Sequence, residues 1–426
     1  MVLAPIAAGR EASLRELLAS MADPAPIADP LNPLVPFGRF DRLHFARFVV
    51  LESHTAEDLA VYGRTPRPWP PSLLFLGDCD GPADSFLREL VDVAGPGLRQ
   101  IFGHCRDFGH HQDLLAWMER HATPPSANYV NWIGRTVTQI HEEAALHAAL
   151  SEHVRAMGPE APIIEPTHLR ERLQEFVGAE RRAGRLKLTP PAPTPVAWSV
   201  GNALHLIGVP LALLVLAPFL LVLSPLLLAR LRWLERTDPE IVPRPDRARI
   251  EALAALEDHD VTNQFSAFGD AKPGLFRRWL VIVLLALLDY SARHIYNHGY
   301  LTRVQTIHFA RWVLLDDKHR MFFASNYDGS LESYMDDFIN KVAWGINAVF
   351  GNGLGFPRTS WLLKGGAEYE QKYKCFLRRH QVPTAVWYKA YPGLTAFDLN
   401  RNTRVRQGLE QRRPSDKEIR AWLGLL

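Results

Sequence analysis

Two parts of the chain repeat each other in both motif and spacing. Residues 44–51 (HFARFVVL) match 308–315 (HFARWVLL), and residues 73–81 (LLFLGDCDG) match 321–329 (MFFASNYDG). The next matching glycine follows each Asp-Gly after 22 positions, from 81 to 103 and from 329 to 351. Agreement of motifs and intervals predicts that one module occurs twice.

Each copy has the pattern of an α+β module. The runs 45–51 and 309–315 are rich in β-forming residues, and the polar residues 316–319 predict a tight turn into a second, antiparallel strand. Each Asp-Gly ends a strand, and Ser330 is a ready N-cap for the helix that follows. Further elements are expected at 84–91, 114–120 and 129–133 in the first copy, and at 331–339, 369–379 and 385–391 in the second. Helices should therefore cover one face of an antiparallel sheet in each copy.

These patterns predict three regions. The first α+β repeat occupies residues 35–155, a linker and membrane-associated helical segment occupies 156–300, and the second repeat occupies 301–410. Tandem copies of such a module are expected to pack together as an intramolecular pseudo-dimer.

The middle region contains a long apolar stretch. No Asp, Glu, Lys or Arg occurs from Leu188 to Ala229, and residues 203–229 are mostly Leu, Val, Ala and Pro. A helix of this length could cross a bilayer, and the alternative is a helix buried inside the protein. Three prolines at 210, 218 and 225 predict a bent or re-entrant helix.

A second apolar run, residues 279–288, is too short to span a bilayer and suits a helix in the membrane interface or one buried against the modules. The polar residues 258–277 before it are interpreted as a solvated loop or as the mouth of a lipid-facing site. A single crossing would place the two copies on opposite sides of the bilayer. We therefore predict a monotopic or hairpin insertion, with both copies on one side, the cytoplasmic side by default.

Composition narrows the classes of function. The chain has 48 Lys+Arg and 46 Asp+Glu among 426 residues, which argues against a nucleic-acid partner. The three cysteines form no CxxC pair, so neither a disulfide framework nor a structural zinc site is expected. The apolar start of residues 1–14 is broken by Pro5 and lacks the sustained core of a signal peptide.

The arginines of the repeated motif are candidates for a functional site. Arg47 and Arg311 lie in apolar strands, where an unpaired guanidinium is costly to bury, so a carboxylate partner is expected for each. The hairpin suggests pairing of Arg311 with Asp328 and of Arg47 with Asp80. The pair could fix the hairpin to the helix, or polarise a bound oxygen species or anionic head group.

Tandem strand–helix modules with a Gly77-Asp-Cys-Asp-Gly81 motif resemble the dimeric α/β-barrel superfamily, which is built from ferredoxin-like modules. Its haem-binding members include the dye-decolourising peroxidases, which carry Gly-x-x-Asp-Gly on the distal side of the haem. The resemblance implies Asp328 as a catalytic residue and His380 as the axial ligand of a haem iron. Ser325 stands at the position of the first glycine in the second copy.

Each of these residues also has a purely structural interpretation. Asp-Gly commonly ends a strand and starts a helix for local reasons, which applies to Asp80 and Asp328. His121 and His380 each follow an arginine at a predicted helix end, where a cation interacts favourably with the helix dipole.

The sequence thus predicts a membrane-associated oxidoreductase, haem-dependent and peroxidase-like, that acts on a hydrophobic or lipid-derived small molecule, with Asp328 and Arg311 as its catalytic residues. The alternative is a non-catalytic binding or scaffold protein docked on membrane lipid. A haem-free enzyme acting on lipids is a third hypothesis, but no Gly-x-Ser-x-Gly motif supports it.

Overall fold

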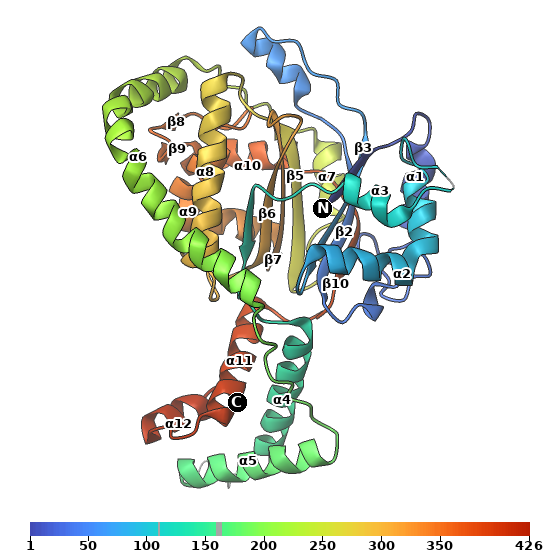
Figure 1. Cartoon of the computed structure of the whole chain (residues 1–426), viewed down its shortest axis with the longest axis vertical. Coiled ribbons are helices and arrows are strands. Elements are labelled where there is room, and N and C mark those ends of the chain that lie inside the picture. The colour runs from blue at the N-terminus through green and yellow to red at the C-terminus, as the bar shows by residue number, and fades with distance from the viewer. Residues whose placement is uncertain (110, 159–163) are drawn as a thin grey trace.

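The computed structural model of the protein describes residues 1–109, 111–158 and 164–426. Two antiparallel four-stranded sheets lie at the centre, and helices cover their outer sides (Figure 1). The predicted α+β class, with helices on one face of antiparallel sheets, is therefore confirmed.

The two sheets have corresponding strand orders. The first has the order β1-β3-β2-β10 and the second has the order β5-β7-β6-β4. The first sheet contains β1 (Val2–Pro5), β3 (Ser72–Cys79), β2 (Leu43–Leu51) and β10 (Thr384–Lys389). The second contains β5 (Thr262–Asp270), β7 (Arg320–Asp328), β6 (Ile307–Leu315) and β4 (Ala127–Val130). A small hairpin, β8 (Thr359–Ser360) and β9 (Lys364–Gly365), lies outside both sheets.

Each sheet takes its last strand from the other part of the chain. β10 pairs with β2, so that Trp387 lies opposite Arg47, and β4 pairs with β6, so that Asn128 lies opposite Arg311. The predicted regions 35–155 and 301–410 are consequently not separate structural units. They also omit β1 and β5, the first strand of each sheet.

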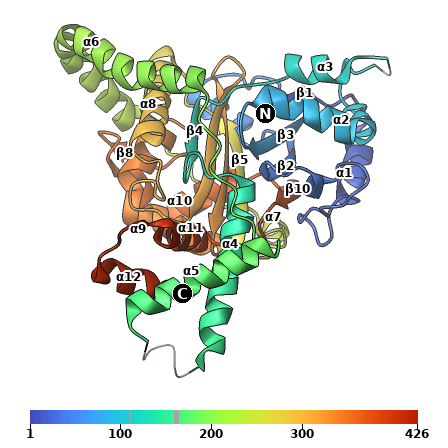
Figure 2. The ribbon, with the colours of Figure 1, turned by 60° about the horizontal axis from the view of Figure 1, so that its bottom comes forward.

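Most of the helices form three groups. On the first sheet lie α1 (Glu11–Ala19), α2 (Ala83–Phe102) and α3 (Leu114–Arg120), and on the second lie α8 (Leu275–His294), α9 (Leu331–Phe350) and α10 (Glu370–His380). A helical extension projects from one end of the two-sheet body (Figures 1 and 2) and consists of α4 (Val137–Ala156), α5 (Pro166–Arg182), α11 (Ala396–Glu410) and α12 (Asp416–Leu423). The remaining helices are α6 (Val196–Thr237) and α7 (Arg247–Ala254).

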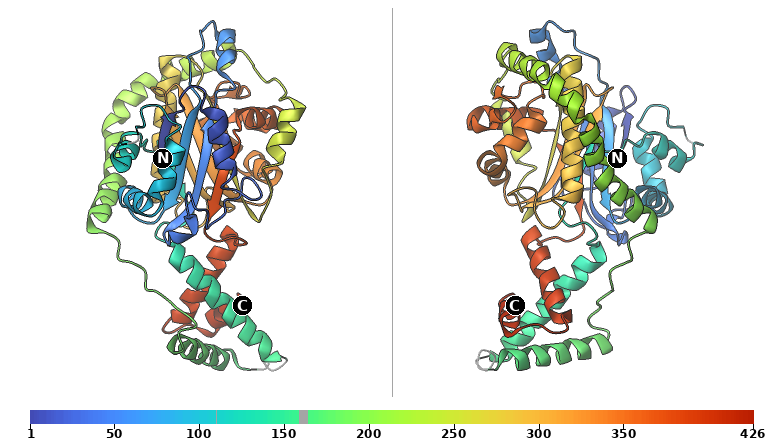
Figure 3. Two further views of the ribbon diagram at one scale, coloured as in Figure 1. Left: turned by 90° about the vertical axis from the view of Figure 1, so that its right-hand side faces the viewer. Right: turned by 60° about the vertical axis from the view of Figure 1, so that its left-hand side comes forward.

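The inner faces of the sheets pack against each other. Along β2, Phe48 and Val50 face the core shared with α2 and α3, whereas Val49 and Leu51 join Val313 of the second sheet in a separate core. This alternation follows from the two-residue period of a strand. The layers are helices, sheet, sheet and helices (Figures 1 and 3).

The β6–β7 turn forms as predicted from its polar residues. Asp316, Asp317 and Lys318 all have positive φ, a conformation suited to a tight reversal. Ser330 caps α9 by accepting a hydrogen bond from the Ser333 N–H at 3.2 Å. In the first half of the chain, Pro82 is the N-cap residue and α2 begins at Ala83, one position before the predicted stretch 84–91.

The interpretation of residues 258–277 as a loop is wrong. Nine of these residues form β5, a buried strand, and α8 begins at Leu275. The strand is polar because it faces buried hydrogen-bonding partners rather than solvent. For example, Gln264 accepts a hydrogen bond from Thr384 at 2.7 Å. The predicted interfacial run 279–288 lies within α8.

One helix is long and apolar enough to span or dock in a membrane. Helix α6 has 42 residues, and none of the residues in its most apolar 18-residue window is buried. Pro210, Pro218 and Pro225 lie inside it, as the sequence suggested. The alternative of a helix buried within the protein is therefore wrong.

Candidate functional site

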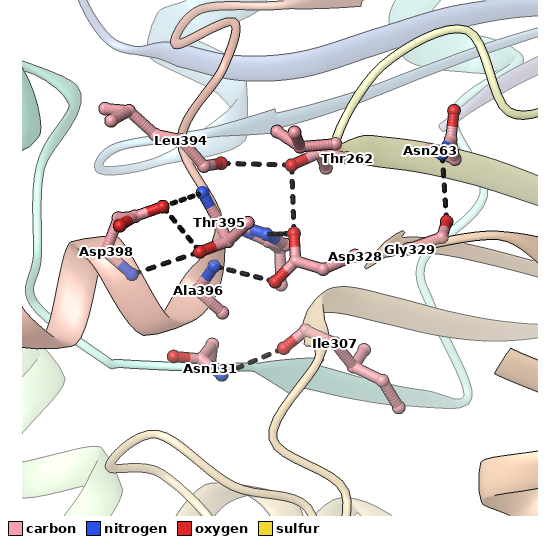
Figure 4. Close-up of polar contacts among 12 residues, drawn as sticks. Asn131, Thr262, Asn263, Ile307, Asp328, Gly329, Leu394, Thr395, Ala396 and Asp398 are labelled. Atoms are coloured by element: carbon pink, nitrogen blue, oxygen red, sulfur yellow. Dashed lines mark hydrogen bonds and ion pairs between the residues drawn. The ribbon is translucent and has the colours of Figure 1, made fainter. Parts of the chain in front are cut away.

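Asp328, the predicted catalytic acid, lies at the end of β7 in a network of hydrogen bonds (Figure 4). Its Oδ1 lies 2.7 Å from His308 Nε2 and accepts a hydrogen bond from the Thr262 hydroxyl at 2.9 Å. Its Oδ2 accepts from the Ala396 N–H, in the first turn of α11, at 2.7 Å. The carboxylate therefore joins β5, β6 and β7 to a helix N-terminus.

The first half repeats this arrangement at Asp80. Its Oδ1 lies 3.0 Å from His44 Nε2, and its Oδ2 accepts a hydrogen bond from the Val137 N–H, in the first turn of α4, at 3.0 Å. Both carboxylates bond the first turn of a helix 57 or 68 residues further along the chain, so these contacts are not the local turn contacts of the structural interpretation. His44 and His308 were not recognised as partners, although each begins the repeated HFAR motif and could have been found from that.

The expected pairing of Arg311 with Asp328 is wrong. Arg311 instead donates from Nη2 to Asp78 Oδ1 at 2.8 Å, across the interface between the sheets. Arg47 likewise crosses to the other sheet, not to Asp80, and donates to Asn326 Oδ1 at 2.6 Å and to the Ser325 carbonyl at 3.0 Å. Because inward-facing strand residues face the opposite sheet, both arginines find partners there.

Burial governs the chemistry of Arg47. Its side chain is enclosed, and this desolvation lowers the pKa of the guanidinium to about 10. Two further acceptors, the Phe265 carbonyl and the Ser266 hydroxyl, each lie 2.9 Å from its Nη1. With these bonds made, Arg47 is a crosslink between the sheets.

His380, the proposed axial ligand, ends α10 and packs on β5. Its Nδ1 lies 2.8 Å from the Phe376 carbonyl, and burial lowers the pKa of the imidazole to about 4. A Cβ added to Gly269 would lie 2.2 Å from the His380 ring. The cavity beside the ring has a volume of about 40 Å³.

The predicted haem residues do not form one site. Asp328 lies opposite Thr262 at the start of β5, whereas His380 touches Gly269 near its end, about 23 Å along the strand. Arg311 faces the opposite sheet. Since ligand sites commonly measure ~300–1,000 Å³, the small cavity at His380 does not fit a haem either. Within 1–109, 111–158 and 164–426, no group of three His, Cys, Asp or Glu side chains could hold a metal ion.

A larger apolar cavity lies between α8 and α9, over the outer face of β6. Its volume is about 280 Å³. Its walls include Leu284, Leu287 and Leu288 of α8, Ala310 and Trp312 of β6, and Phe338, Val342 and Gly345 of α9. We call this cavity the α8–α9 pocket. Val342 has non-helical φ/ψ, so α9 is kinked where it borders the pocket.

The pocket adjoins a polar hollow of about 390 Å³. Tyr296, Thr302 and Trp344 line both spaces, and Arg303 and Lys341 complete the hollow. We call the hollow the mouth. An apolar interior with a few polar groups at its opening is typical of sites for hydrophobic small molecules.

Helix α6 is fastened to α8 at both of its ends. Near the α6 N-terminus, Arg293 donates to Asn202 Oδ1 at 2.6 Å, and His205 Nδ1 lies 2.8 Å from His294 Nε2. At the other end, Asp238 forms an ion pair with Arg277. Between these ends α6 bends over the outer side of α8 (Figures 1 and 3).

No family model, curated protein or solved structure matches this chain.

Proposed function

We propose that this protein docks on a membrane and takes up a hydrophobic small molecule from the lipid into the α8–α9 pocket. One observation carries the proposal: α8 is both a wall of the apolar pocket and the support to which the exposed apolar helix α6 is fastened. The proposal corresponds to the non-catalytic binding alternative of the sequence.

The attachment of α6 supports a monotopic or hairpin insertion. From Asn202 to Asp238 the helix is about 54 Å long, whereas its two attachment points on α8, Arg293 and Arg277, are about 24 Å apart. The excess length is taken up in a bend, for which the three prolines provide the cause. Since both ends return to the same body, the two sheets lie on one side of the bilayer, the cytoplasmic side by default.

The surface around α6 supports the same orientation. Helix α8 presents an exposed stripe at four-residue intervals, formed by Leu275, Trp279, Val283 and Leu287. Exposed tryptophans occur on α6, α8, α9 and the residues after β8, at positions 198, 233, 279, 344 and 361. Tryptophan favours the level of the lipid head groups, so these residues suit the rim of an inserted surface.

The pocket opens toward this surface. Leu287 is 41% exposed on the α8 stripe, and Trp344 is 52% exposed on α9, yet both also line the pocket. A hydrophobic molecule could thus pass from lipid to pocket without crossing water, which is favourable because apolar surface stays out of water throughout.

We infer further that the two halves are copies of one ferredoxin-like module. The corresponding strand orders, the two His–Asp–helix arrangements and the two crossing arginines support this. A haem-dependent oxidoreductase remains a prediction from the sequence alone, because Asp328, Arg311 and His380 do not lie in one site. A Soret band after haem supplementation would restore it.

Flotation with lipid vesicles tests the membrane proposal. The double substitution Leu214→Glu and Leu221→Glu places charges on the exposed part of α6, so vesicle binding should fall more than tenfold, because charges are costly in hydrocarbon. The control is Leu31→Glu, which changes a leucine that is 73% exposed in the first half. Equal flotation of all three proteins would refute the proposal.

A further inference from the structure

We infer that the α8–α9 pocket binds a single-chain lipid with a carboxylate head, a long-chain fatty acid, with its head in the mouth. This inference rests on the proposed function and names its ligand class. It depends on the size of the pocket, the charge at the mouth and the unpaired donors in the walls.

The size of the pocket favours one alkyl chain. At about 280 Å³ it is at the small end of ligand sites, which commonly measure ~300–1,000 Å³. Its walls are mostly leucine, isoleucine, valine and aromatic side chains from α8, β6, α9 and the segment between α8 and β6. A lipid with two acyl chains would leave much of its apolar surface outside the pocket.

The charge at the mouth favours an anionic head. Lys341 forms an ion pair with Asp337 at 2.7 Å. Arg303 is exposed, and among the described residues no carboxylate lies within ion-pair distance of it. One positive charge at the mouth is therefore left without a partner, and guanidinium matches the two oxygens of a carboxylate.

Two donors in the walls have no hydrogen-bond partner among the residues that the structure describes. They are the buried Thr302 hydroxyl, which lies between pocket and mouth, and the indole N–H of Trp312, which lines the pocket only. An alkyl chain in the pocket leaves the Trp312 N–H unpaired whatever its head group, so only Thr302 distinguishes the ligands. A hydrocarbon would leave the Thr302 hydroxyl unpaired, whereas a carboxylate beside Arg303 can accept from it.

The backbone around the mouth departs from ordinary geometry at two positions. Thr302 has a φ of +56°, and α9 departs from helical geometry at Val342, next to Lys341. A threonine rarely adopts a positive φ, and such strained positions occur often at ligand sites.

The experiment compares palmitate with hexadecanol, which has the same chain without the charge. Binding to the full-length protein in detergent is measured with radiolabelled palmitate and hexadecanol. We expect wild type to bind palmitate at least tenfold more tightly than hexadecanol. Arg303→Gln should weaken palmitate binding about tenfold and change hexadecanol binding less than twofold, because only the charge-assisted bond is lost. Arg88→Gln, an exposed arginine on α2, is the control.

A second variant separates the ligand inference from the proposed function. No atom of the described residues lies within 4 Å of a Cβ built at Gly345, so Gly345→Leu should fill the pocket without strain and abolish binding of both molecules. If wild type binds both equally and Gly345→Leu blocks both, the fatty-acid inference is overturned and the proposed function stands. If Gly345→Leu binds both like wild type, the pocket is not the site and both fail.

Discussion

The corresponding helices α2 and α9 show how the two halves differ. Each has 20 residues and begins two positions after an Asp-Gly, and each carries a glycine fourteen positions after its first residue, at 97 and at 345. A Cβ at Gly97 would lie 1.9 Å from the Leu34 carbonyl oxygen, whereas a Cβ at Gly345 would meet no atom within 4 Å in the described part of the chain. In the first half a chain segment fills the space beside the helix, and in the second half that space is a pocket.

The helices that precede the two hairpins, α1 and α8, also differ in how much apolar surface they leave exposed. Helix α1 has 9 residues, and its apolar face is buried in the first core, with Leu14 and Leu18 fully covered. Helix α8 has 20 residues and leaves an apolar stripe exposed. The first half therefore buries its apolar surface in its own core, whereas the second half leaves both a pocket and an exposed apolar stripe, the two features on which the proposed function rests.

The largest expected effect concerns the two crossing arginines. Arg47→Ala should lower the free energy of unfolding by about 3–5 kcal/mol, because it leaves several buried acceptors unpaired. Arg311→Ala should cost less, about 2–3 kcal/mol, because the buried Asp78 carboxylate loses its ion-pair partner but keeps the hydrogen bond from the Asn326 amide. Chemical denaturation in detergent measures both, and equal losses would contradict the asymmetry.

Substitutions at the two helix glycines, Gly97 and Gly345, should change the free energy of unfolding by smaller and different amounts. Gly97→Ala should destabilise the fold by about 1–3 kcal/mol, because the new methyl group meets backbone that cannot move freely. Gly345→Ala should be neutral or stabilise by up to about 1 kcal/mol, since alanine favours a helix and meets open space. Similar losses at both sites would mean that the pocket is not open in solution.

His380 should make stability depend on acidity. Its pKa is lowered from 6.5 to about 4, so the folded state resists protonation more than the unfolded state does. The stabilisation is present above pH 6.5 and is lost as the pH falls toward 4, on the order of 3 kcal/mol. His380→Gln should flatten this part of the curve. His121→Gln, at the corresponding position of the first half, is the control, and an unchanged slope in His380→Gln would contradict the assignment.

The sequence predicted much of the secondary structure because its signals are local. The Asp316–His319 turn, the Ser330 cap and the long apolar helix each depend on residues close together in the chain. β5 was missed because its polar residues, such as Gln264, look like a loop unless their buried partners are known. β1 was missed because Pro5 breaks the apolar start, yet a proline is tolerated on an edge strand.

The candidate site could be predicted only in part. The sequence indicated a membrane-facing middle and a hydrophobic ligand, but not the pocket, whose walls come from separate parts of α8, β6 and α9. The predicted pair of Arg311 and Asp328 lies within one hairpin. It was wrong because a local sequence pattern does not show that the two sheets face each other. The exchange of β4 and β10 was missed for the same reason.

The exchange of β4 and β10 between the sheets means that the first sheet can be completed only late in synthesis. Strand β2 leaves the ribosome early, but its neighbour β10 follows more than 300 residues later, roughly 20–60 seconds at ordinary rates of translation. Until then one edge of the nascent first sheet is open and prone to pair wrongly. The apolar helix α6 emerges during this interval. If it docks as proposed, the growing chain is held at the lipid surface before β10 arrives to complete the sheet.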